Sequence, residues 1–313
     1  MQPSDKIKVI RCLVLSDTHD LEFTQENRAR LSLPKADVIL HCGDLTNNGD
    51  MEGYQRAIDW LISMDAEIKI VIAGNHDLTL DETYKAPSGD HVAQYEEAAA
   101  LWKSYSDNGL YYLEEGTYSF ELSNGTKFRI YASPYQPLFE SATAFKYPRH
   151  HDRYNPAKTH ASGAENVATE RSTIPKLVDI VMTHAPASGI LDKLSDGRSR
   201  GCPHLLRAIR RVKPKLHCFG HVHDSNGARM ISWNSKIPEI PASSNELENI
   251  SEDTYCPAVI GSSGCATRYI NTIRATNTQM TTLAINASIG NIDGKPVHPA
   301  YLVTLDISST VSV

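Results

Sequence analysis

The chain has 313 residues, of which 41% are hydrophobic and 22% are charged, values that are ordinary for globular proteins. A chain of this length buries enough surface to fold without disulfides or a structural metal. Its 31 Lys and Arg against 37 Asp and Glu give a net charge of −6, which argues against a broad nucleic-acid-binding surface but leaves nucleotides open as ligands. No apolar run approaches the ~18 residues of a membrane span.

Short apolar runs that end abruptly in polar residues recur along the chain. Near-continuous runs of this kind are typical of strands that are buried on both faces. They predict strands over residues 8–15, 37–42, 67–73, 179–182 and 216–219. Apolar positions at helical spacing predict helices over residues 51–64, 92–105 and 203–211. Asp50 is the expected N-cap of the first helix, and Pro203 opens the last.

A hairpin and three late strands complete the predicted elements. Residues 119–133 form the expected hairpin, with Asn124-Gly125 supplying the turn. The late strands are predicted over residues 229–233, 281–285 and 301–307. We expect a single domain spanning residues 1–313. Two polar stretches, near residues 139–173 and 234–264, are longer than usual connections and are expected to be surface loops or a lid.

The six cysteines would suggest disulfides only in an oxidising compartment. Residues 1–8 are polar, and the apolar run at 9–15 is too short and too early for a secretory segment. We therefore expect reduced thiols and a cytoplasmic location.

Ligand-type side chains follow each of the five early strands. In layered α/β folds, ligands bind outside the carboxyl ends of strands. Each residue alone is weak evidence, since Asp, Asn and His are common in loops, but together they predict a metal centre. Carboxylate, imidazole and amide ligands suit Mn²⁺, Fe or Zn²⁺, and a carboxylate can bridge two ions ~3.5–4 Å apart. The seven residues are Asp17, His19, Asp44, Asn75, His184, His221 and His223.

The ordered motifs resemble the calcineurin-like metallophosphoesterase superfamily. They are Asp17-x-His19, Gly43-Asp44, Gly74-Asn75-His76-Asp77, His184 and Gly220-His221-x-His223. Further segments resemble its metallophosphoesterase domain-containing branch, namely Ser133-Pro134-Tyr135-Gln136-Pro137, Thr183-His184-Ala185-Pro186, Arg200-Gly201-Cys202 and Asn286-Ala287-Ser288. Ala185 stands where that branch would have glycine.

The resemblance implies a four-layer α/β/β/α sandwich of two mixed sheets, with two divalent metal ions at one edge. Mn²⁺ is favoured, with Fe or Zn²⁺ as alternatives. One ion would be held by Asp17, His19, Asp44 and His223. Asp44 would bridge to the second, which Asn75, His184 and His221 would hold. His76 would act on a phosphate oxygen or on the leaving group, with Asp77 orienting its ring. A purely structural role for His76 and Asp77 stays open.

Three functions are open at this stage. A phosphodiesterase acting on small diesters is favoured, with cyclic nucleotides suggested by the resemblance alone. A phosphomonoesterase is the alternative, but related phosphatases carry an arginine after the Gly-Asp motif, and residues 45–49 contain none. A non-catalytic scaffold is the third, although none of the expected ligands is missing.

Weaker candidates are given no catalytic role. Arg200 is expected to be solvated, and Cys42 to pack in the core. The adjacent His150 and His151 are expected to point to opposite faces of an extended chain.

Overall fold

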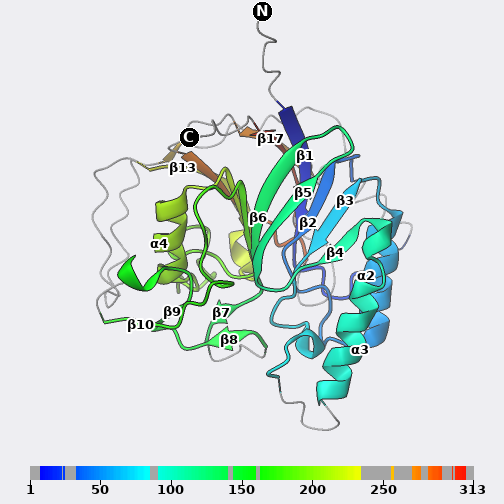
Figure 1. The fold of residues 1–313 in the computed structure, drawn as a ribbon, viewed down its shortest axis with the longest axis horizontal. Coiled ribbons are helices and arrows are strands. Elements are labelled where there is room, and N and C mark those ends of the chain that lie inside the picture. Colours follow the sequence, from blue (N-terminus) through cyan, green and yellow to red (C-terminus); the bar gives the residue numbers. More distant parts are fainter. Residues whose placement is uncertain are drawn as a thin grey trace, which may run out of the picture.

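The computed structural model describes residues 8–22, 24, 33–84, 91–139, 144–159, 163–233, 255–256, 270–275, 281–290, 298 and 300–307. They form two large sheets packed face to face, with helices on the outer face of each (Figure 1). This is the four-layer α/β/β/α sandwich of two mixed sheets that the family resemblance implied.

The first sheet contains the first three predicted strands side by side. Its described strands, in spatial order, are β15 (Ile270–Ala275), β17 (Ala300–Ile307), β1 (Lys8–Leu15), β2 (Val38–His41), β3 (Ile68–Val71) and β4 (Leu110–Tyr112). Strands β1 to β4 run parallel to one another, whereas β17 is antiparallel to β1. The carboxyl ends of β1, β2 and β3 therefore lie at the same edge.

The second sheet contains the expected hairpin and the later strands. Its described order is β14 (Tyr255–Cys256), β13 (Gly227–Ser232), β16 (Thr281–Asn286), β12 (Leu216–Phe219), β11 (Ile180–Thr183), β6 (Lys127–Ser133) and β5 (Gly116–Glu121). Strands β5 and β6 are antiparallel around Gly125, whose φ of 75° suits glycine. Strands β6, β11, β12 and β16 are parallel, so they too end together.

The main core lies between the sheets. Ile10, Val14 and Leu40 of the first sheet pack in one buried cluster with Met182 and Leu283 of the second. Burial of such side chains on both sheets holds the two layers together, at roughly 25 cal/mol per Å² of apolar surface. The packing thereby fixes how the two sets of strand ends face each other.

Helices cover the outer faces as predicted. On the first sheet lie α2 (Met51–Ser63) and α3 (His91–Lys103), and on the second lies α4 (Pro203–Val212). Asp50 caps α2, since its carboxylate accepts a hydrogen bond from Gly53 N at 2.8 Å. Short 3₁₀ turns cover Leu78–Leu80, Ser106–Asn108, Ala157–Thr159 and His223–Ser225. No helix of the described residues is long and apolar enough to cross a membrane.

The stretch 139–173 is packed where it is described. Two short ladders pair β7 (Gln136–Pro137) with β8 (Lys146–Tyr147) and β9 (His151–Asp152) with β10 (Glu165–Asn166). Tyr147 and Tyr154 are buried against the outer face of the second sheet, which a loose surface loop would not achieve. Of the stretch 234–264, all but β14 lies outside the described residues.

Candidate metal centre

All seven predicted ligands gather where the strands of both sheets end. Asp17, Asp44 and Asn75 follow β1, β2 and β3, while His184 and His221 follow β11 and β12. Backbone hydrogen bonds tie the first loops together, from Asp17 N to the Gly43 carbonyl at 2.9 Å and from His19 N to the Asp44 carbonyl at 3.0 Å. The loops from the two sheets thus close around one point.

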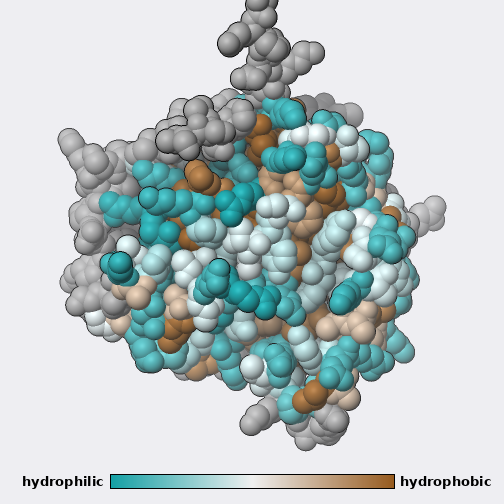
Figure 2. All heavy atoms as spheres, in the orientation of Figure 1, coloured by the Kyte–Doolittle hydropathy of each residue, from teal (hydrophilic) through white to brown (hydrophobic). Residues whose placement is uncertain are grey.

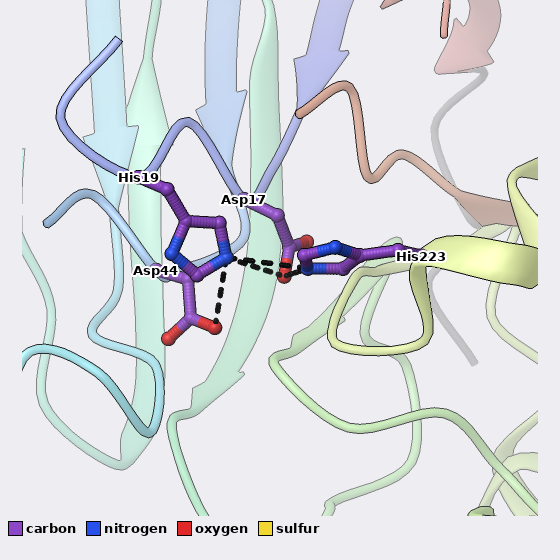
Figure 3. A group of neighbouring side chains, drawn as sticks. All are labelled: Asp17, His19, Asp44 and His223. Carbon is purple, nitrogen blue, oxygen red and sulfur yellow. Dashed lines mark hydrogen bonds and ion pairs between the residues drawn. The ribbon is translucent and has the colours of Figure 1, made fainter. Parts of the chain in front are cut away.

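A first cluster joins Asp17, His19, Asp44 and His223 (Figure 3). Nε2 of His223 lies 3.1 Å from Asp17 Oδ1 and 3.2 Å from Nε2 of His19. Nε2 of His19 is 3.6 Å from Asp44 Oδ2. Four donor atoms from distant parts of the chain therefore converge without a lysine or arginine among them.

A second cluster shares Asp44 with the first and adds His184 and His221. Nε2 of His184 lies 3.5 Å from Asp44 Oδ2 and 3.0 Å from the side-chain oxygen of Asn75. The rings of His184 and His221 are in edge contact, with centroids 5.0 Å apart. Asp44 Oδ2 thus stands between His19 and His184, the position that a bridging ligand needs.

The backbone is strained where the ligands are held. Asp17, Asp44 and His221 have φ values of 58°, 54° and 69°, in the left-handed region that L residues rarely adopt. Such conformations cost of order 1–3 kcal/mol each and cluster at functional sites. The hydrogen bonds between the loops offset that cost here.

Two glycines of the sequence motifs are required because side chains approach their Cα atoms too closely to leave room for a Cβ. A Cβ at Gly74 would collide with the Asp44 carboxylate, and one at Gly220 with the Asp17 carboxylate. Their place in the sequence motifs therefore has a steric reason.

The charges and protonation states of the side chains in the two clusters suit the binding of a cation. Asp17 and Asp44 are buried. Burial opposes their ionisation, but the hydrogen bond from His223 holds the pKa of Asp17 well below its usual range, and His184 and His19 lower the pKa of Asp44. Burial lowers the pKa of His221 to about 3. The site therefore offers ionised carboxylates and, at His221, a neutral imidazole.

The contact of His184 with a backbone carbonyl also fits a metal ligand. Its Nδ1 lies 2.9 Å from the Cys42 carbonyl oxygen, so Nδ1 carries the proton and donates it to the carbonyl. Nε2 then presents a lone pair toward Asp44 and Asn75. Carbonyl-oriented imidazoles of this kind are usual among metal-ligating histidines. The residues present thus fit two divalent cations.

Asp77 is arranged differently from the prediction. Its carboxylate does not contact the ring of His76. It accepts hydrogen bonds from the backbone N–H groups of Leu45, Thr46 and Gly74 at 2.8–3.2 Å and from the Thr46 hydroxyl at 2.9 Å. It therefore joins the loop that carries Asp44 to the loop that carries Asn75.

The ring of His76 is oriented by a backbone group instead. Its Nδ1 lies 2.9 Å from the carbonyl oxygen of Asn47, and its backbone N–H donates to Asp44 Oδ1 at 2.8 Å. The ring meets that of His19 edge to face at 4.9 Å. His76 is thus fixed beside the first cluster without being part of it.

Asn286 and Ser288, which were not predicted as site residues, also contact the metal centre. The Ser288 hydroxyl donates to Asp17 Oδ2 at 2.7 Å, and the Asn286 amide donates to the Val222 carbonyl at 2.8 Å. Asn286 is the last residue of β16 and Ser288 follows that strand, which is parallel to β12, so the strand-end rule used for the predicted ligands would have found them. They hold Asp17 and the loop that carries His221 and His223.

Replacing Ser288 by alanine is expected to lower metal affinity by about 10–100-fold, as is typical when a metal-binding side chain loses the hydrogen bond that orients it. Asp17 would keep its charge but lose the contact that orients Oδ2. Competition with a fluorescent chelator measures the effect, and S119A, at an exposed serine of β5, is the matched control. Equal affinity in S288A and the native protein would contradict this role.

Metal affinity is also expected to depend on pH. Burial acts against the charged form of His223, but the hydrogen bond and charge of Asp17 raise its pKa above 6.5. In the metal-free protein, the stability from this pair is fully present below about pH 6.5 and is lost as pH rises through the raised pKa. A cation must displace that proton, so affinity should fall about tenfold per pH unit below the pKa.

Calorimetric titration between pH 5.5 and pH 8 checks this slope. H223Q, which removes the titrating group, should bind more weakly and show a shallower dependence. Affinity of the native protein that stays constant over this range would rule the coupling out.

His150 and His151 do not point to opposite faces, contrary to the prediction. Their Nε2 atoms lie 3.7 and 3.3 Å from the same Glu165 oxygen. His150 belongs to a turn, closed by a hydrogen bond from His151 N to the Pro148 carbonyl. The alternation of an extended chain therefore does not apply.

The fold and the two clusters define a protein that holds divalent metal ions in a dinuclear site at the edge of a two-sheet sandwich. The family model for calcineurin-like phosphoesterases matches residues 10–225. The chain belongs to this family, in its metallophosphoesterase domain-containing branch.

Several curated proteins are similar to the chain. Metallophosphoesterase domain-containing protein 1 of Homo sapiens is 33% identical over 69% of this chain and 61% of its own length. A UPF0046 protein of Caenorhabditis elegans is 29% identical over 72% of this chain and 67% of its own. A probable rhamnogalacturonate lyase C of Emericella nidulans is 33% identical over 72% of this chain, but over only 18% of its own length.

Proposed function

We propose that the chain is a phosphodiesterase that acts on small diesters, with cyclic nucleotides as the first class to test. One observation carries the preference for diesters: no cation stands in the loop after Asp44. The described residues 45–49 contain no arginine or lysine, and Arg56 is paired with Asp20 at 3.0 Å. A dianionic monoester depends more on such a phosphate clamp than a monoanionic diester does.

We propose the predicted ligands for the two ions. Asp17, His19, Asp44 and His223 would hold one, and Asp44, Asn75, His184 and His221 the other. Two divalent cations held there would supply Lewis-acid chemistry that lowers the pKa of water and neutralises charge on phosphoryl oxygens. Mn²⁺ is the metal to test first, against Fe and Zn²⁺, since all three accept imidazole and oxygen ligands.

His76 is the proposed general acid. The Asn47 carbonyl accepts the Nδ1 proton, so in the imidazolium form Nε2 carries a second proton that it can give to the departing alkoxide. The half-buried ring is accessible to a ligand. Asp77 has a positioning role only, because it holds the loops of Asp44 and Asn75 together and its carboxylate does not contact the His76 ring.

We also propose a cytoplasmic location. It is supported by four cysteines of the described residues that are buried and free, namely Cys12, Cys42, Cys202 and Cys218. Reduced thiols are usual in that compartment.

The test is hydrolysis of bis-p-nitrophenyl phosphate and p-nitrophenyl phosphate by metal-stripped protein refilled with Mn²⁺, followed by 3′,5′-cyclic nucleotides. Metal-dependent turnover with a higher kcat/KM for the diester is expected. H76Q should keep both metals but lose about 10²–10⁴-fold in kcat. A preference for the monoester would replace the diesterase by a phosphatase. No turnover with two metals bound would favour a binding scaffold.

A further inference from the structure

Two arginines and one phenylalanine from separate loops meet on the surface. The guanidinium carbon of Arg200 lies 4.5 Å from the centroid of the Phe139 ring, and that of Arg149 lies 5.5 Å from it. Arg149 is exposed and Arg200 half-buried. The two guanidinium carbons are therefore at most about 10 Å apart.

Neither guanidinium has a carboxylate partner among the residues that the structure describes. Nearby arginines do, since Arg153 pairs with Glu115 at 2.6 Å, Arg171 with Glu114 at 3.0 Å and Arg198 with Asp196 at 2.6 Å. Without a carboxylate in ion-pair contact, the two arginines form a local excess of positive charge in a chain of net charge −6, with Asp196 as the acidic group that Arg200 influences at longer range.

The three residues are fixed to one another by the fold. Leu138 N donates to the Tyr147 carbonyl at 2.7 Å, which sets Phe139 beside residues 148–149. The Tyr147 hydroxyl contacts the sulfur of Cys202 at 3.1 Å, which brings residues 200–202 to the same place. The cluster is thus built from packed segments.

The same segments adjoin the metal centre on the side of Asn75 and His184. Cys202 N donates to the Pro186 carbonyl at 3.0 Å, two residues beyond His184. On the other side, Ala144 N, beside β8, donates to the Asn75 carbonyl at 3.3 Å. Strand β7 lies just past the end of β6 (Figure 1), and Figure 2 shows strongly hydrophilic side chains over this region.

The chemistry of the cluster favours a phosphate group. Stacking on a ring holds a guanidinium in place while its N–H donors stay free around the edge. Two such forks can each take a pair of oxygens from a dianionic phosphate, and the anion also relieves the repulsion between them.

We propose that Arg149, Arg200 and Phe139 form a subsite for a second phosphate group on the organic part of the substrate. The inference rests on the proposed function, hydrolysis of a phosphodiester at the adjacent centre. It narrows the substrate class to small diesters that carry an additional phosphate, such as a nucleoside derivative phosphorylated at two positions.

Two chromogenic esters that differ only in that group test the subsite. They are thymidine 5′-(p-nitrophenyl phosphate) and the same compound with a 3′-phosphate. The Mn²⁺-loaded protein should show a kcat/KM about ten- to a hundredfold higher for the 3′-phosphorylated ester, the value of a charge-assisted hydrogen-bond pair. R149Q and R200Q should each lose most of that ratio.

R171Q is the control, since Arg171 is an exposed arginine whose charge is paired with Glu114. It should keep the preference, and thermal unfolding should show that all variants are folded. Equal kcat/KM for the two esters in the native protein would overturn the proposal. So would a preference that survives in the double variant R149Q/R200Q.

A binding measurement separates this proposal from the proposed function. Thymidine 3′,5′-bisphosphate and thymidine 5′-monophosphate are titrated calorimetrically, which requires no turnover. If neither ester is hydrolysed but the bisphosphate binds more tightly only when both arginines are present, the subsite stands and the diesterase fails. If both nucleotides bind equally, the subsite fails whatever the enzyme hydrolyses.

Discussion

Replacement of Asp44 by asparagine is expected to remove bound metal and to lower kcat by at least about a thousandfold, more than the 10–100-fold typical when a residue that only orients a metal ligand is lost. The reason is that Asp44 Oδ2 stands 3.6 Å from Nε2 of His19 and 3.5 Å from Nε2 of His184. No other carboxylate oxygen of the described residues has this place between the two clusters. An amide at this position has lost the charge and one of its two oxygens.

Asparagine is chosen because it preserves the local fold. Asp44 Oδ1 accepts a hydrogen bond from His76 N at 2.8 Å, which the amide oxygen can still accept. Metal content by mass spectrometry and turnover of bis-p-nitrophenyl phosphate are measured together. D59N, at an exposed aspartate of α2, is the control. Two tightly bound ions in D44N would show that Asp44 is not the bridge.

Replacement of Asp77 by asparagine is expected to destabilise the protein by about 1–3 kcal/mol. Four donors meet this fully buried carboxylate, and an amide NH₂ would face at least one of them. Burial and the nearby Asp44 raise the pKa of Asp77 to about 7. Ionising Asp77 in the native protein therefore costs free energy, and an uncharged asparagine avoids that cost. For this reason the expected loss in the free energy of unfolding is smaller than the summed contribution of the four hydrogen bonds to the carboxylate.

Urea unfolding at pH 8 measures this difference, because the native side chain is then ionised. D107N, at an exposed aspartate, should change the free energy of unfolding by less than about 0.5 kcal/mol. Should D77N be as stable as the native protein, Asp77 would not hold the two loops. A loss of metal affinity alongside the loss of stability would show that the loops position the ligands.

Much of the architecture follows from local pattern. The apolar runs at β1, β2, β3, β11 and β12 were recognisable because buried strands need near-continuous apolar residues. The helices α2 and α4 were recognisable from their spacing and from Asp50 and Pro203. Strands β4 and β15 were not predicted. Strand β4 has only three residues, too few to show a period, and β15 (INTIRA) mixes polar and apolar residues and depends on pairing with β17.

The candidate ligands were also accessible from sequence, since each follows a strand that ends at the metal edge. The contacts made by the residues beside these ligands were not accessible from the sequence. Asp77 was expected to orient His76 because the two are adjacent, but the backbone of the Asn75–Asp77 turn sends the carboxylate to Thr46. Asn47, far away in the chain, supplies the carbonyl that holds the ring instead. Adjacency in sequence says little about direction once the backbone leaves regular structure.

The sequence by itself determined which residue types end the buried strands, and hence the metal chemistry, because strand periodicity and ligand type are local properties. Only the tertiary structure decided which of them meet. His223 reaches Asp17 across 206 residues and Ser288 reaches it across 271. The pairing of Arg149 with Arg200 on Phe139 depends on how three loops pack. Such contacts arise from the docking of two sheets, which no local pattern encodes.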